Sequence, residues 1–241
     1  MIKFFRHIRR SLIQKNQMGK YFKYAFGEIL LVVIGILIAL QINNWNEDKK
    51  SQKAANYVLQ EIHNNLKEDG SILKEILLQR EKAGKSVAKM ISYLKNKRIN
   101  KDSLSADMLN FLTFERYFPI NNGYEIFTSK GLELSNNTLT NKISRYYNYE
   151  QKKMNRSVID VEKAIIEILE DRTGISSFIE TLDLREKLVL KNYNDPTLKR
   201  DLYTEITAFK NNNKGTIRSV KAFLELNKEL ITDIEKELEN D

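Results

Sequence analysis

An uninterrupted apolar run from Ile29 to Leu40 constrains this chain more than any other feature of its sequence. A run of this length suits a buried core helix or a signal-peptide core as well as a membrane span, which needs about 20 residues. The flanks favour a span, because only Glu28 and Gln41 are polar between Tyr24 and Ile42. Aromatic residues suited to the two membrane interfaces lie on both sides: Tyr21, Phe22, Tyr24 and Phe26 before the run and Trp45 after it. We therefore expect an uncleaved transmembrane helix over residues 20–46.

The distribution of charge predicts the orientation of that helix. Residues 1–28 hold seven basic residues and one acidic residue, so that most of the net charge of +8 precedes the span. Basic residues accumulate on the cytoplasmic side of bacterial inner-membrane spans. We therefore expect a cytoplasmic N-terminus and an exported C-terminal part. Because no basic stripe follows along the remaining chain, the composition argues against a nucleic-acid partner.

Residues 1–19 have the pattern of a basic amphipathic helix. Apolar residues recur at helical spacing, and cations lie around the other face: Arg6, Arg9, Arg10 and Lys15. Such a helix can lie in the headgroup layer of the anionic cytoplasmic leaflet. The alternative is a segment that only sets the topology and packs on nothing.

Four residues of the span are candidates for anchoring and for contact with another subunit. Glu28 lies at the cytoplasmic edge, where it either reaches the headgroups or pairs with a nearby lysine or another chain. Gly35 and Ala39 form a pair of small residues four apart, which lets two spans approach closely but is also common by chance. Trp45 marks the far interface.

The same residues carry a family resemblance. The stretch from Tyr24 to Glu47, which includes GEILLVVIGILIALQINNWNE, resembles the N-terminal signature of a family of uncharacterised membrane proteins from Bacteroidota. The opening MIKFFR and the later FPINNGY, residues 118–124, resemble that family too. The resemblance implies a single-pass inner-membrane protein with a periplasmic C-terminal part. It implies no reaction, ligand or catalytic residue.

Residues 47–241 are predicted to form an all-α, elongated periplasmic domain. Apolar residues recur at intervals of three, four and seven from Gln52 to Asn96, and again from Met154 to Ile168. A third helix is expected after Asp195, a good N-cap, with Pro196 in its first turn. Residues 211–215 offer a place where it is interrupted. Three such stripes predict an antiparallel helical bundle or a coiled-coil stalk.

Residues 111–137 break the helical pattern and are rich in aromatic side chains. Two interpretations remain open: a cap that seals the distal end of the bundle, or a partly polar surface for a ligand or partner protein. The candidate residues for such a surface are Phe114, Tyr117, Phe118, Tyr124 and Phe127.

Catalysis finds little support in the sequence. The chain has no cysteine, which excludes thiol nucleophiles and thiolate metal sites. Its two histidines, His7 and His63, are expected on opposite sides of the membrane. No common catalytic or phosphate-binding motif occurs. We therefore predict neither an enzyme, nor a catalytic residue, nor a metal, nor a cofactor.

Two classes of function remain after these exclusions. The first is a membrane-anchored scaffold of the cell envelope that associates with itself or with other envelope proteins. The second is a periplasmic sensing module that binds a small molecule and acts through a membrane partner, because the predicted cytoplasmic part is too short for an output domain.

Overall fold

The computed structural model describes residues 10, 18–95, 100–132 and 134–240, and of Tyr21 and Asn240 it describes the backbone alone. The chain divides into two compact units at Ala54–Ala55. The sequence pattern had placed the start of the bundle at residue 47. One helix, α2 (Met18–Lys95), belongs to both units.

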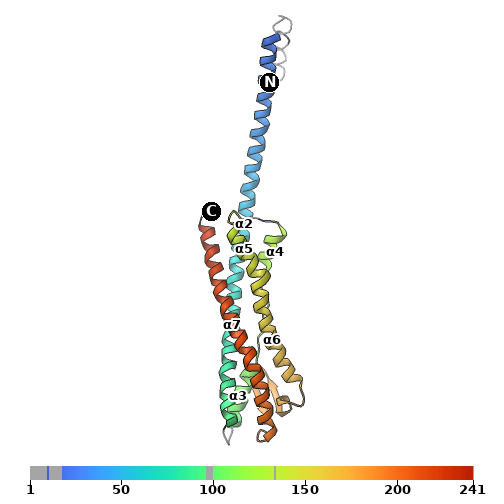
Figure 1. Cartoon of the computed structure of the whole chain (residues 1–241), viewed down its shortest axis with the longest axis vertical. Coiled ribbons are helices and arrows are strands. Elements are labelled where there is room, and N and C mark those ends of the chain that lie inside the picture. Colours follow the sequence, from blue (N-terminus) through green and yellow to red (C-terminus); the bar gives the residue numbers. More distant parts are fainter. Residues whose placement is uncertain (1–9, 11–17, 96–99, 133, 241) are drawn as a thin grey trace. The chain divides into compact units, whose positions relative to one another are not determined.

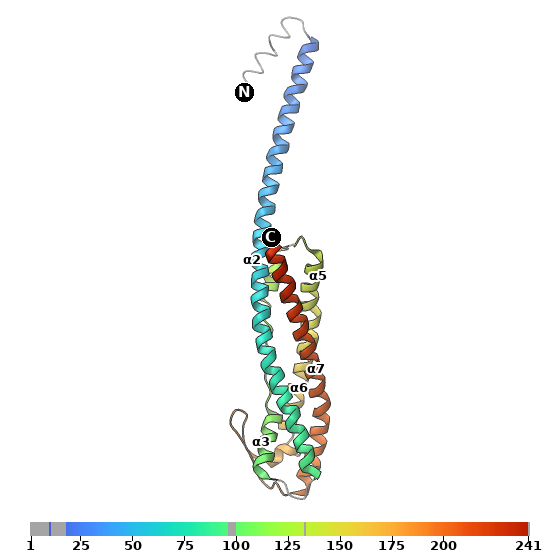
Figure 2. The same cartoon turned by 90° about the vertical axis from the view of Figure 1, so that its left-hand side faces the viewer.

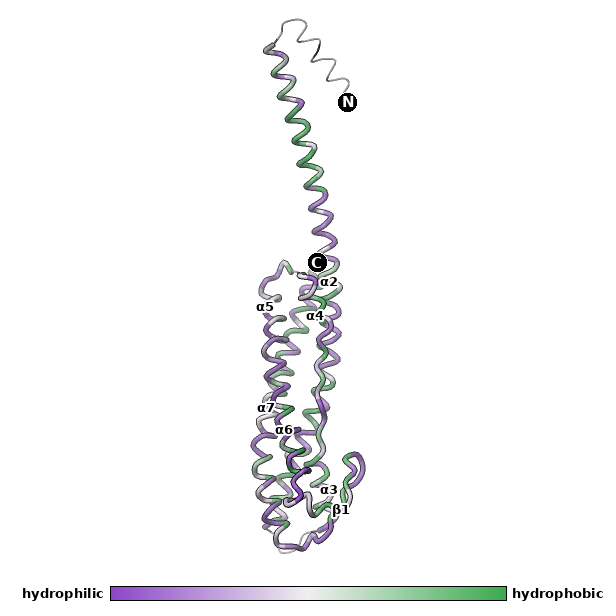
Figure 3. The backbone as a smooth tube through the Cα atoms, turned by 90° about the vertical axis from the view of Figure 1, so that its right-hand side faces the viewer, coloured by the Kyte–Doolittle hydropathy of each residue, from purple (hydrophilic) through white to green (hydrophobic). Residues whose placement is uncertain are grey.

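Apart from Arg10, the described residues of unit 1 are the first part of α2. Figure 3 shows residues 29–42 as an almost continuous hydrophobic stretch of this helix. Its apolar side chains are exposed, for example Ile29 at 64% and Leu37 at 59%. Among the described residues, α2 is the one helix long and apolar enough to cross a membrane. Such a surface, uncovered by protein, matches the hydrocarbon of a bilayer better than it matches water.

Unit 2 is an all-α bundle, as expected, with one small hairpin added (Figure 1). After α2 its elements are α3 (Lys101–Leu112), α4 (Asn122–Ser129), α5 (Asn137–Arg145), a π-helix (Tyr146–Glu150), α6 (Gln151–Glu170), a 3-10 turn (Ile175–Phe178), β1 (Ile179–Asp183), β2 (Lys187–Leu190) and α7 (Pro196–Asn240). Figures 1 and 2 both show α6 and α7 running beside the second part of α2. α7 begins at Pro196 as predicted, because the Asp195 carboxylate accepts the backbone N–H of Thr197 at 2.8 Å.

Two buried asparagines on α7 fix its antiparallel register against α2. Asn227 donates its side-chain amide to the carbonyl of Leu66 at 3.0 Å, and Asn213 donates to the carbonyl of Arg80 at the same distance. Each contact lies beside a glycine of α2, Gly70 or Gly84, where a Cβ would be within 3.1–3.3 Å of the asparagine. The two contacts are 14 positions apart on both helices, which is two heptads. This pairing also explains why α7 is continuous through residues 211–215, where an interruption had been anticipated.

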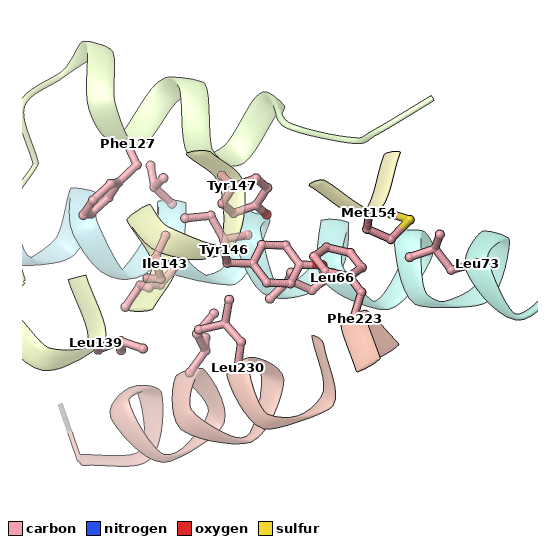
Figure 4. Close-up of a cluster of buried hydrophobic side chains, with 14 of the residues drawn as sticks. Leu66, Leu73, Phe127, Leu139, Ile143, Tyr146, Tyr147, Met154, Phe223 and Leu230 are labelled. Carbon is pink, nitrogen blue, oxygen red and sulfur yellow. The ribbon is translucent and has the colours of Figure 1, made fainter. Parts of the chain in front are cut away.

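The interior of unit 2 contains two hydrophobic clusters. One surrounds Leu66 and Phe223 at the end where α4 and α5 lie, and Figure 4 shows its aromatic centre. The other surrounds Phe111 and Phe209 at the end where α3 and the hairpin lie. The Phe111 and Phe209 rings meet edge to face at 4.7 Å, a favoured arrangement for aromatic pairs.

The π-helix explains why two consecutive tyrosines are both buried, which regular helical periodicity does not predict. A regular helix turns consecutive side chains about 100° apart, whereas Tyr146 and Tyr147 are both buried. Tyr146 stacks on Phe223 with ring centroids 4.7 Å apart, and Tyr147 stacks on Tyr124 at 4.5 Å.

The hairpin was likewise absent from the sequence-based expectation. Strands β1 and β2 pair antiparallel around a turn in which the Asp183 side chain accepts the backbone N–H of Arg185.

The cap interpretation of residues 111–137 places them together at the distal end of the bundle, whereas the structure distributes them between the two clusters. The segment starts in the α3 cluster at Phe111 and returns along α2, so that Gly123 donates its N–H to the Asn65 side chain at 3.0 Å. Its aromatic residues are consequently divided between the two clusters, except Phe118, which is exposed. A run of aromatic residues with a proline and glycines indicates that the preceding helix ends. It does not indicate in which direction the chain continues.

Candidate binding groove

A buried carboxylate holds one end of the non-helical segment 113–121. Asp69, on α2, is 1% exposed and accepts three hydrogen bonds. The donors are the Tyr117 hydroxyl at 2.8 Å, the Ile120 backbone N–H at 3.2 Å and the Gln151 side chain at 3.2 Å. Burial raises the pKa of Asp69, and the three donors only partly oppose that shift. The carboxylate thus joins α2, the segment and α6 at one point.

A buried arginine holds the other end. Arg80 lies further along α2, is 2% exposed, and donates to the backbone carbonyl of Thr113. Gln79 donates to the same carbonyl at 3.5 Å. Burial lowers the pKa of the Arg80 guanidinium to about 10, and the carboxylate of Glu115 opposes that effect. The segment is therefore fastened to α2 at both ends.

Between these attachment points the segment forms one wall of an open groove, which we call the cationic groove. The groove has a volume of about 710 Å³, within the range of ligand pockets. The opposite walls come from α2, the end of α3 and the hairpin turn. Its lining consists of Gln79, Lys82, Leu109, Asn110, Thr113, Phe114, Glu115, Arg116, Phe118, Leu184 and Arg185.

Positive charge predominates in the cationic groove. Arg116 is paired with Glu162 of α6 at 2.6 Å and its guanidinium lies 5.9 Å from the centre of the Phe114 ring. Lys82 and Arg185 are exposed, and among the described residues neither side chain forms an ion pair or hydrogen bond. Glu115 is the one acidic residue of the lining. The groove can therefore attract an anionic group, and its two phenylalanines offer apolar contact beside the charges.

The structure separates the five aromatic residues that the sequence had proposed as a partner surface. Phe114 and Phe118 line the cationic groove, and Phe118 is 73% exposed. Tyr117 and Phe127 are buried in the cluster around Leu66, and Tyr124 is partly buried against Tyr147. In an extended segment, neighbouring side chains point to opposite faces. This alternation could have indicated that Tyr117 faces inward when Arg116 and Phe118 face outward.

Gln79, Lys82 and Arg185 are among the groove residues that the sequence-based reasoning did not identify. They lie up to about a hundred positions apart, on α2 and the hairpin turn, and only the fold brings them together. Each resembles an ordinary solvent-facing residue when its own segment is viewed alone.

The membrane-related candidates belong to unit 1. Gly35 and Ala39 are exposed on α2, and a Cβ on Gly35 would meet nothing within 4 Å. Trp45 is 59% exposed, with the Lys49 ammonium 4.0 Å above its ring, and Glu28 is partly covered. Arg10 is helical and exposed, whereas Arg6, Arg9 and Lys15 lie outside the described residues.

Among the described residues, no group of three or more histidine, cysteine or acidic side chains is placed so that it could bind a metal ion. His63, the histidine they include, instead contacts Glu235 of α7 at 2.9 Å. The contact joins the first and last helices of unit 2.

A second titratable site lies where α6 ends against α7. Glu205 accepts the backbone N–H of Ile175 at 3.0 Å, while its other carboxylate oxygen is buried without a partner among the described residues. Burial, with Asp171 and Asp201 nearby, raises the pKa of Glu205 to about 7 from 4.5. The folded protein therefore binds a proton there more readily than the unfolded chain does.

We expect this proton to make the folded state more stable in mild acid. The contribution of Glu205 is fully present below pH 4.5 and is lost as the pH rises through about 7. Because Glu205 is only half-buried, we expect a contribution of about 1–2 kcal/mol rather than the full value of the shift. Thermal unfolding of the protein and of Glu205→Gln between pH 5 and 8 measures it. The difference between the two should change across that range, and a constant difference would contradict the assignment.

Comparison with known proteins identifies the chain at the level of a family. A family model matches residues 28–193, which is more than two thirds of the chain. The chain belongs to the family of unknown function DUF6090. The family match begins at Glu28 inside the apolar helix and includes every residue that lines the cationic groove. It ends before α7. No curated protein and no solved structure matched the chain.

Proposed function

We propose that this member of the family is a membrane-anchored helical scaffold of the cell envelope that holds other proteins, including further copies of itself. The observation that carries the proposal is the exposed apolar surface of α2 before Ala54, on a helix that continues into unit 2. A helix with that surface is stable in a bilayer, and unit 2 then presents its surfaces at one membrane. The cationic groove is the surface best suited to contact a partner.

The proposed location is the inner membrane of a Gram-negative bacterium, with unit 2 in the periplasm. The excess of basic residues before the span supports this orientation, and so does the resemblance to Bacteroidota membrane proteins. Reporter enzymes fused after residue 20 and at the C-terminus test it. We expect retention of the first reporter and export of the second, and a cytoplasmic C-terminus would contradict the topology.

The scaffold role is tested on the full chain in mild detergent. We expect a defined oligomer, or stable complexes with other membrane proteins, when mass is measured by light scattering and co-purifying proteins are identified. A lone monomer with no co-purifying protein would contradict the scaffold role.

A sensing role is the second candidate, because the cationic groove has a volume suited to a small anion. Such a module would transmit binding through α2 to a membrane partner. It predicts a monomer whose Tm rises with an anionic metabolite.

A further inference from the structure

The backbone of residues 114–118 is an open hydrogen-bonding edge. The carbonyl of Thr113 is occupied by Arg80 and Gln79, and the N–H of Ile120 is occupied by Asp69. Between them, the backbone N–H and C=O groups of residues 114–118 form no hydrogen bond with any described part of the chain. Glu115, Arg116 and Phe118 are exposed, Phe114 is partly buried and Tyr117 is buried, so the segment borders solvent along most of its length.

The edge is held in a non-helical form before any partner arrives. Thr113 is extended, with φ −75° and ψ 132°, and Pro119 disfavours helix at Phe118. Asp69 and Arg80 fasten both ends of the segment, so folding already orders it. Binding of a partner then loses less conformational entropy. Residues 114–118 are not part of a strand in the free protein, but a non-helical backbone with unpaired N–H and C=O groups can pair with an extended peptide by β-augmentation.

The charges beside the edge indicate what that peptide carries. Lys82 and Arg185 stand across the cationic groove from the segment, exposed and without an ion-pair partner among the described residues. In an extended peptide, alternate side chains point to the same face. Acidic residues at alternate positions would therefore form one face of the peptide, and that face can meet these two cations.

We propose that the cationic groove binds an extended acidic segment of a partner protein, which pairs its backbone with residues 114–118. The proposal deepens the scaffold role and rests on it. Charge complementarity supplies selectivity and speed of association, and the backbone hydrogen bonds supply a register. Pro119 cannot donate to a ladder, so pairing stops there.

The probe is a fluorescein-labelled ten-residue peptide of alternating glutamate and valine, added to the full chain in mild detergent at low salt. Fluorescence anisotropy should show saturable binding. The same peptide with lysine in place of glutamate should not bind. Methylation of alternate backbone nitrogens should weaken binding by roughly tenfold, the effect of losing about 1.4 kcal/mol of hydrogen bonding.

Charge reversal in the groove supplies the decisive comparison. The double variant Lys82→Glu, Arg185→Glu should bind the acidic peptide at least about tenfold more weakly. The control Lys210→Glu, Lys228→Glu makes the same change in net charge at two exposed positions of α7 outside the groove, and should bind normally. Equal binding by both double variants would contradict the proposal, as would no saturable binding up to about 1 mM peptide.

The outcomes separate this proposal from the scaffold role on which it rests. If complexes with other proteins survive the Lys82→Glu, Arg185→Glu exchange, the scaffold role stands and the groove is not its contact. If inorganic phosphate raises the Tm while the acidic peptide does not bind, the groove takes a small anion, and the peptide proposal is wrong.

Discussion

Replacing Asp69 with alanine should destabilise unit 2 more than any other single polar substitution that we consider. The substitution leaves three donors without an acceptor: the buried Tyr117 hydroxyl and Gln151 amide and the partly buried Ile120 N–H. Each buried unsatisfied donor costs about 1–3 kcal/mol, so we expect a loss of about 3–5 kcal/mol. In thermal unfolding of the full chain in detergent, this corresponds to a fall in Tm of about 6–20 °C.

Hydrogen exchange distinguishes the expected mechanism from general loosening. Asp69 accepts the Ile120 N–H, so the Ile120 amide should exchange faster in Asp69→Ala even below its Tm. The control is Glu68→Ala, an exposed neighbour on the same helix, which should change stability by less than about 0.5 kcal/mol. Equal effects at the two positions would show that the buried network does not stabilise the fold.

Replacing Gly123 with alanine should have the second-largest effect, because α4 approaches α2 most closely there. A Cβ on Gly123 would lie 2.9 Å from the backbone nitrogen of Ile62 and 3.0 Å from the Asn65 side-chain oxygen. Backbone cannot move aside as a flexible side chain can, so α4 must shift and weaken the bond from Gly123 to Asn65. We expect a loss of about 2–3 kcal/mol in the free energy of unfolding.

The matched control for Gly123→Ala is Gly215→Ala, which should have the opposite sign. Gly215 lies inside α7, and a Cβ there would meet nothing within 4 Å. Alanine favours the helix over glycine by about 0.5–1 kcal/mol, so the variant should be more stable than the natural protein. Denaturant unfolding of both variants measures the two effects. A stable Gly123→Ala would mean that the close approach of α4 is not needed.

Helical periodicity predicted most of the secondary structure of unit 2. The apolar stripes on α2, α6 and α7 are long and regular, and the Asp195–Pro196 start of α7 was found because capping is a local interaction. The hairpin and the π-helix were not predicted. The hairpin strands are only five and four residues long, and a π-helix has no pattern of its own in the sequence.

The candidate site was only partly predictable for a similar reason. Phe114 and Phe118, two of the five aromatic residues proposed as a partner surface, line the groove, whereas Tyr117 between them turns inward to Asp69. Nothing near Tyr117 in the sequence indicates a buried carboxylate 48 positions earlier. Likewise, the cations Lys82 and Arg185 come to line one groove only in the folded chain.

The sequence by itself determined the features that depend on neighbouring residues: the apolar helix before Ala54, the all-α class and the positions of the long helices. The tertiary structure alone decided the return path of segment 113–121 along α2, and with it the open edge and the cationic groove. That division has a physical reason. Helix formation and membrane burial follow from local hydrogen bonding and local hydropathy, whereas the course of this segment depends on two buried polar side chains, Asp69 and Arg80, that meet it only in the folded chain.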